Sequence, residues 1–253
     1  HAPLMVAEQF GTLETLFPGR IDLGLGRAPG TDQATARALR RYAEQADNFP
    51  SDVMELIAFL DTEPGTTRVS AIPGAGTRVP VWLLGSSTFG AELAALMGLP
   101  YAFASHFAPA LLDEAIHVYR SHFRPSERLE RPHVMMAAGV FAAETDAEAE
   151  HLRTSQLLAF ARLRSGRPGR LPPPVRDVRD HVAPAALERA QAALSVSATG
   201  SLATVRARLD ALIRRHGPDE IILTGMAYDP DARRRSFALA AEAMRGLDAR
   251  SAA

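Results

Sequence analysis

Three consecutive hydroxyl residues follow a short apolar run in the first half of the chain. The run covers residues 81–84, and residues 85–88 then read Gly-Ser-Ser-Thr. Apolar residues return at helical spacing over 91–97, so the pattern predicts a buried strand, a turn and a helix. The free N–H groups of that helix start, its dipole and the hydroxyls would hold an anion such as a phosphate. An ordinary N-cap is the competing interpretation, because Ser and Thr often cap helices.

A second candidate for anion binding is Arg27, at the end of a predicted strand over residues 20–27. Glycine weakens a strand interior, so Gly24 and Gly26 near the end of this strand indicate close approach of backbone or ligand. The planar, permanently charged guanidinium of Arg27 suits an anion. The competing interpretation is a surface arginine, since most arginines are exposed.

Two further polar residues, Ser105 and His106, lie near the end of a predicted strand over residues 99–107. A single histidine is more often a hydrogen-bonded structural residue than a catalytic group. The catalytic residues therefore stay unknown at this point, with His106 as the one candidate.

The composition excludes several classes of protein. The 253 residues carry 28 basic and 29 acidic side chains, for a net charge of −1, so no nucleic acid or membrane surface is expected as a partner. The chain has no cysteine, which excludes disulfides and thiolate ligands, and we expect no metal site. Without a long apolar segment or signal peptide, a cytoplasmic protein is expected. Because the chain begins with His1, we expect a fragment of a longer product.

Predicted strands and helices alternate along the chain, which is typical of an α/β protein with a parallel sheet. Five strands are predicted, near residues 20, 81, 100, 133 and 220, each followed by a helix. We expect one domain over 1–253, with irregular excursions at 61–80 and 165–180. The first of these is an excursion or a lid-type loop. Five such units fit either part of an α/β barrel or a flavodoxin-like open sheet.

Several stretches of the chain resemble the bacterial luciferase-like family of flavin-dependent monooxygenases. Residues 18–27 are similar to the glycine- and arginine-rich fourth strand of that family, and Gly85-Ser86-Ser87 is similar to its flavin-phosphate turn. Further similar stretches, in the family's order, are residues 1–10, 103–107 and 199–205. The resemblance implies a TIM-barrel type of α/β fold in which barrel strands 1 to 3 are absent from this chain.

The resemblance also implies which residues bind the cofactor. Arg27 matches an arginine beside the flavin phosphate or ring, and Gly90 matches a phosphate contact that glycine can make only through its N–H. Ser105 and His106 match positions near the isoalloxazine ring. The implied cofactor-binding residues are Gly26, Arg27, Ser86, Ser87, Gly90, Ser105 and His106.

The function implied by the resemblance is oxidation of a small organic substrate with reduced FMN and O2. The reduced FMN would come from a flavin reductase or from NAD(P)H, and a homodimer is a further expectation. Two alternatives stay open. One is a deazaflavin-dependent oxidoreductase that transfers hydride on the same scaffold, and the other is a non-catalytic remnant with an incomplete flavin pocket.

Overall fold

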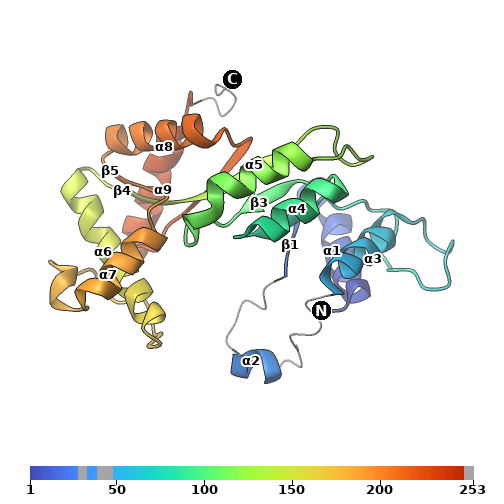
Figure 1. Cartoon of the computed structure of the whole chain (residues 1–253), viewed down its shortest axis with the longest axis horizontal. Coiled ribbons are helices and arrows are strands. Elements are labelled where there is room, and N and C mark those ends of the chain that lie inside the picture. The colour runs from blue at the N-terminus through green and yellow to red at the C-terminus, as the bar shows by residue number, and fades with distance from the viewer. Residues whose placement is uncertain (28–32, 39–47, 248–253) are drawn as a thin grey trace. The chain divides into compact units, whose positions relative to one another are not determined.

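A computed structural model describes residues 1–27, 33–38 and 48–247 (Figure 1). The strands are β1 (Leu23–Gly26), β2 (Val81–Gly85), β3 (Tyr101–Phe103), β4 (Val134–Ala142), β5 (Ser197–Gly200) and β6 (Glu220–Thr224). The α-helices are α1 (Pro3–Leu16), α2 (Gln33–Ala38), α3 (Phe49–Asp61), α4 (Thr88–Met97), α5 (Leu112–His122), α6 (Asp146–Arg164), α7 (Pro184–Ala193), α8 (Leu202–His216) and α9 (Pro230–Met244). Short 3-10 helices cover Pro109–Leu111 and Val178–Asp180.

The chain divides into two compact units. The first unit contains His1–Tyr101 and Val118–Pro132, and the second contains Ala102–His117 and His133–Ala253. Two of the three boundaries fall inside β3 and inside α5, and the third lies between Pro132 and His133, just before β4. Each unit is described by itself below.

In the first unit, β1 and β2 pair in parallel, with Leu23 opposite Val81 and Gly26 opposite Leu84. Helix α4 packs against β2, and α1 packs against α3 (Figure 1). The apolar spacing of α3 places Val53, Leu56 and Leu60 in the core because these residues recur on one helical face. The predicted strand–turn–helix over 81–97 is therefore present.

The 61–80 segment packs directly on α1 through two glycines. A Cβ atom on Gly11 would lie 2.1 Å from the Cα atom of Gly74, and a Cβ atom on Gly74 would lie 2.4 Å from the carbonyl oxygen of Ala7. Only glycine allows backbones to approach this closely. The contact fixes the middle of the segment to the helix.

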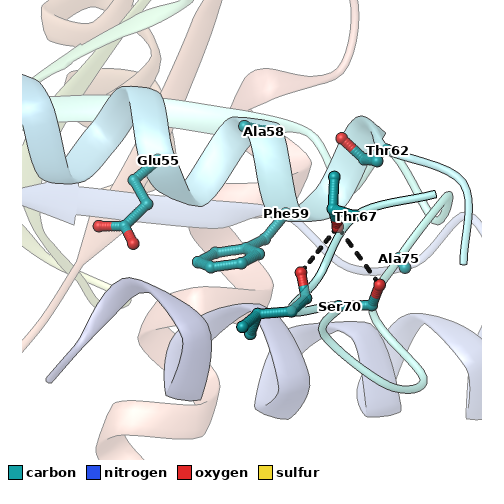
Figure 2. A pocket seen from close by; sticks show the side chains of 8 residues that line it. Glu55, Ala58, Phe59, Thr62, Thr67, Ser70 and Ala75 are labelled. Carbon is teal, nitrogen blue, oxygen red and sulfur yellow. Dashed lines mark hydrogen bonds between the residues drawn. The ribbon is translucent and has the colours of Figure 1, made fainter. Parts of the chain in front are cut away.

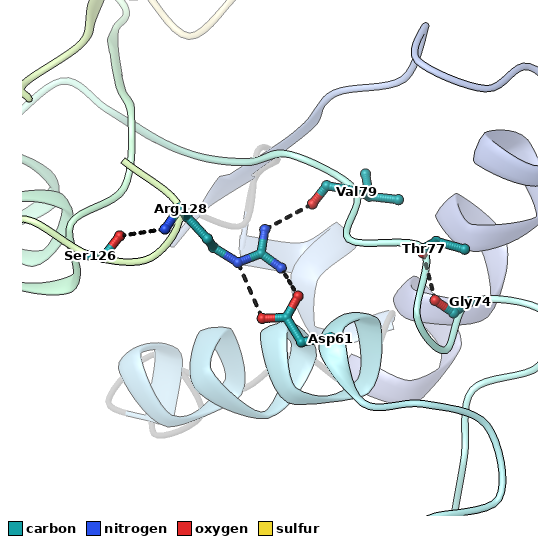
Figure 3. Close-up of polar contacts among 6 residues, drawn as sticks. All are labelled: Asp61, Gly74, Thr77, Val79, Ser126 and Arg128. Atoms are coloured by element: carbon teal, nitrogen blue, oxygen red, sulfur yellow. Dashed lines mark hydrogen bonds and ion pairs between the residues drawn. The ribbon is translucent and has the colours of Figure 1, made fainter. Parts of the chain in front are cut away.

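One arginine holds both ends of the same segment (Figure 3). The Arg128 guanidinium makes two hydrogen bonds to the carboxylate of Asp61, the last residue of α3. It also donates to the carbonyl oxygen of Val79 at 3.2 Å, shortly before β2. With its ends and its middle attached, the segment is an anchored excursion within the first unit.

In the second unit, β4 pairs in parallel with both β5 and β6. One core cluster joins β4, β5, α8 and α9 and includes Val140, Ala198, Val205 and Leu209. A second cluster lies between α6 and α7, which run side by side (Figure 1). Helix α8 ends at Gly217, which has φ of 55°, as its sequence predicts.

The α/β class with parallel strands is confirmed, but the strand count differs from the prediction. The described residues contain six strands, and the additional one is β5. Its four residues are small or polar, so it shows no apolar run, and it forms because its backbone pairs with β4. Strands β1 and β3 are also shorter than the predicted 20–27 and 99–107. The sequence also predicts a helix over residues 31–45, after the first strand; within this range the structure describes only residues 33–38, which form α2.

Candidate functional site

The predicted anion site lies in the turn that joins β2 to α4, in the first unit. Gly85 ends the strand, and Ser87 occupies the N-cap position with extended backbone, at φ of −145° and ψ of 170°. The Ser87 side chain makes no cap hydrogen bond to the helix. Ser87 is therefore the N-cap residue by position, as the competing interpretation expects, but its hydroxyl does not bond the first-turn N–H groups of α4.

Tyr101 contacts this turn from the neighbouring strand β3, and the sequence analysis did not single out this residue. Its hydroxyl donates to the carbonyl oxygen of Ser87 at 3.2 Å, and burial raises the pKa of Tyr101, so the group keeps its proton. A Cβ atom on Gly85 would lie 3.4 Å from this hydroxyl, and one on Gly90 would lie 3.5 Å from the Tyr101 ring. Gly90 is thus buried against Tyr101 and Gly85, a packing role in addition to the predicted N–H contact. A tyrosine within an apolar strand is a usable signal, because a buried hydroxyl needs an acceptor.

The parallel pairing of β1 and β2 brings Arg27 to the same turn. Gly26 lies opposite Leu84, so the next residue, Arg27, leaves β1 beside the end of β2. The Arg27 guanidinium carbon lies 4.1 Å from the centroid of the Phe89 ring, in the first turn of α4. The structure therefore gathers Gly26, Arg27 and the 85–90 turn in one place.

The start of α8 offers a contrasting case within the second unit. Its sequence, Gly200-Ser201, is like the Gly85-Ser86-Ser87 turn. Here the Asp146 carboxylate accepts the backbone N–H of Ser201 at 2.6 Å, and this bond is the main cause that lowers the pKa of Asp146. Ser201 is the N-cap residue of α8, but its side chain makes no cap bond to the helix. A carboxylate of the chain itself already serves as the anion at this helix start.

Ser105 and His106 lie in a turn after β3 and not at the end of the strand, which corrects the predicted position. Both belong to the second unit. The buried Ser105 hydroxyl donates to the carbonyl oxygen of Ala137 at 2.5 Å, so it has a structural partner. His106 contacts the Phe107 ring edge-on, with centroids 4.7 Å apart. Burial lowers the pKa of His106, and its Nδ1 atom is buried without a hydrogen-bond partner among the described residues.

A cavity of about 130 Å³ lies elsewhere in the first unit, between α3 and the anchored excursion (Figure 2). The Phe59 ring lies between the carboxylate of Glu55 and the hydroxyls of Thr67 and Ser70. The lining residues are Glu55, Ala58, Phe59, Thr62, Thr67, Val69, Ser70 and Ala75. None of the predicted site residues lines this cavity.

Over residues 1–27, 33–38 and 48–247, no group of three or more His, Asp or Glu side chains could hold a metal ion. Within the same ranges, no helix has the length and apolar character needed to cross a membrane.

Comparison with known proteins is consistent with this geometry. The family model for luciferase-like monooxygenases matches residues 1–220. A luciferase-like monooxygenase of Escherichia coli strain K12 is 51% identical over 241 residues, which cover 95% of this chain and 72% of the relative. The crystal structure of apo-MsnO8 aligns with a TM-score of 0.81 at 32% identity, covering 97% of this chain and 74% of that chain.

Two more distant structures share the fold. One is the oxygenating constituent of 3,6-diketocamphane monooxygenase from Pseudomonas putida in complex with FMN, with a TM-score of 0.61 at 17% identity over 94% of this chain and 74% of that one. The other is an F420-dependent secondary alcohol dehydrogenase, with a TM-score of 0.64 at 13% identity over 98% of this chain and 74% of that one. The identity to the Escherichia coli protein and the match of the family model decide the classification: this chain belongs to the luciferase-like monooxygenase family.

Proposed function

We propose that this chain is a flavin-dependent oxidoreductase that uses reduced FMN and O2 to oxidise a small organic substrate. The proposal rests on one contrast between two serine-containing helix starts. The start of α8 receives the carboxylate of Asp146, whereas the start of α4 receives no cap from Ser87 and has the Arg27 guanidinium beside it. Free N–H groups and a fixed positive charge are the donors that a terminal phosphate needs.

The residues of this turn fit such a phosphate by their chemistry. Ser86 and Ser87 offer hydroxyls, the first turn of α4 offers N–H groups including that of Gly90, and Arg27 offers a charged fork. Gly26, which directly precedes Arg27, is proposed as a further contact on the basis of the resemblance. When bound, reduced FMN supplies the electrons with which O2 is activated, and the protein supplies binding and exclusion of water.

Ser105 and His106 are proposed as flavin contacts on the basis of the resemblance. His106 suits this role because its Nδ1 atom lacks a partner among the described residues, and burial keeps the ring neutral at neutral pH by lowering its pKa. A role for His106 in catalysis stays a prediction. The flavin reductase, the homodimer and the cytoplasmic location likewise remain predictions.

A titration of the whole chain with flavins tests the proposal. Flavin fluorescence should give tighter binding of FMN than of riboflavin, since the two ligands differ only by the phosphate. Arg27→Gln and the pair Ser86→Ala/Ser87→Ala should each weaken FMN binding by about 10-fold or more, the size of a lost charge-assisted hydrogen bond. Ser201→Ala is the matched control, because α8 already has the Asp146 carboxylate at its start. Equal affinity for FMN and riboflavin would contradict the proposal.

A deazaflavin-dependent hydride transfer is the second candidate, because the F420-dependent dehydrogenase shares the fold with the FMN-bound monooxygenase. A parallel titration with an F420-type deazaflavin separates the two. Tighter binding of the deazaflavin, without O2 uptake on reduction, would favour hydride transfer. Binding of neither cofactor would favour a non-catalytic remnant.

A further inference from the structure

Phe89 has a contact that the proposed phosphate site does not by itself explain. Phe89 is the second residue of α4 and so belongs to its first turn. The N–H groups of this turn receive no hydrogen bond from the Ser87 side chain. The guanidinium carbon of Arg27 lies 4.1 Å from the centroid of its ring. This distance is well within the range of about 6 Å over which a cation is attracted to an aromatic face.

The contact with the Phe89 ring gives the Arg27 guanidinium a defined position before a ligand binds. The residue is exposed and follows the last residue of β1, and no ion pair involving Arg27 is found among the described residues. A free arginine side chain has about 2 kcal/mol of rotamer entropy to lose when it binds a ligand. A ring that already holds the guanidinium reduces that loss at the moment of binding.

Two other arginine–aromatic pairs have the same type of contact but lie at a different part of a helix. Arg20 lies 5.9 Å from the Phe17 ring at the end of α1, and Arg164 lies 5.3 Å from the Phe160 ring at the end of α6. Both are helix C-terminal regions, where no anion is favoured. Only the pair of Arg27 and Phe89 joins a guanidinium to the N-terminal turn of a helix, among the three pairs found in the described ranges.

We propose that Phe89 is a positioning residue: its ring holds the Arg27 guanidinium at the start of α4, so that Phe89 sets the preference for a phosphorylated flavin. This inference rests on the proposed function, because it concerns the same phosphate. Phe89 acts through Arg27 and makes no hydrogen bond to the ligand. Its loss therefore lowers affinity for FMN and leaves affinity for riboflavin unchanged.

The test is a double-mutant cycle read as the ratio of riboflavin Kd to FMN Kd. Phe89→Leu should lower this ratio by about 2- to 5-fold, the effect of an exposed cation–π contact of about 0.5 to 1 kcal/mol. Phe89→Tyr and Phe89→Trp keep an aromatic face, so they should keep the ratio close to that of the wild type. In the Arg27→Gln background, Phe89→Leu should change the ratio by less than about 1.5-fold, because the partner is already gone.

Phe17→Leu is the matched control, since it removes an arginine–aromatic contact away from the turn and should leave the ratio unchanged. Inorganic phosphate should compete with FMN less effectively in Phe89→Leu than in the wild type. The positioning role is overturned if Phe89→Leu weakens FMN and riboflavin equally, or if it has its full effect without Arg27. A wild-type chain that does not prefer FMN over riboflavin would instead overturn the proposed function, and this inference with it.

Discussion

The hydroxyl of Tyr101 donates a hydrogen bond of 3.2 Å to the carbonyl oxygen of Ser87, the residue directly before α4. The two residues belong to different elements, and the bond ties the turn before α4 to the beginning of β3. The tyrosine ring also fills the space beside Gly85 and Gly90. The shape of the turn thus depends on one buried side chain.

Tyr101→Phe should therefore destabilise the protein by about 1 kcal/mol, because the half-buried carbonyl of Ser87 loses its donor. It should also weaken FMN binding, since the turn is no longer fixed. Tyr119→Phe is the matched control: the Tyr119 ring packs against Tyr101, with centroids 5.4 Å apart, but its hydroxyl donates to the carbonyl oxygen of Leu99 at 2.9 Å and not to the turn. Urea unfolding and flavin titration measure the two effects. If both variants lose flavin affinity equally, Tyr101 has no specific role in the turn.

Arg128→Ala should destabilise the first unit by about 1 to 3 kcal/mol, because Asp61 and the Val79 carbonyl lose charge-assisted hydrogen bonds at once. Limited proteolysis should then cut within the 61–80 segment, whose two ends are no longer attached. Arg179→Ala breaks the exposed ion pair with Asp177 and should change stability by no more than about 0.5 kcal/mol. An unchanged proteolysis pattern for Arg128→Ala would show that the Arg128 hydrogen bonds do not hold the segment.

Gly74→Ala should destabilise by about 1 to 3 kcal/mol, as overpacking does in a well-packed interior. The new methyl group would lie 2.4 Å from the carbonyl oxygen of Ala7, so α1 and the excursion must separate. Gly169→Ala is the control, since nothing lies within 4 Å of its added Cβ atom. Thermal unfolding of both variants checks the difference, and equal melting temperatures would contradict the contact with α1.

The stability of the protein should fall as the pH drops below about 6.5, in part because of His216. Burial is the main cause that lowers the pKa of His216, although its Nδ1 atom lies 2.7 Å from the Asp113 carboxylate. The unfolded chain then takes up a proton at about 6.5, before the folded chain does. The contribution of His216 to the free energy of unfolding is therefore fully present above about pH 6.5. It is lost as the pH falls from there through the lower pKa of His216 in the folded protein.

Urea unfolding between about pH 5 and pH 8, on either side of the ordinary histidine pKa, measures this dependence. His216→Gln removes the titrating group, so its free energy of unfolding should vary less with pH over this range. A variant with the same slope as the wild type would show that other groups cause the pH dependence.

Much of the local structure could be predicted from the spacing of apolar residues and from helix signals. A glycine directly after an apolar helical pattern predicts a helix end, and α4 and α8 do end at the left-handed residues Gly98 and Gly217. Thr145 caps α6 by accepting the N–H of Glu148, as its capping-box pattern predicts. These features depend on residues a few positions apart, so they are readable along the chain.

Other features arose only in the folded chain, because they join residues distant in sequence. Strand β5 has no apolar pattern and exists through its pairing with β4. The Asp146 carboxylate fills the start of α8, while the start of α4 has Arg27 held over Phe89 instead. The two helix starts read alike as Gly-Ser sequences. Tertiary packing decides that a carboxylate lies at one helix start and a guanidinium at the other, because both side chains come from distant parts of the sequence.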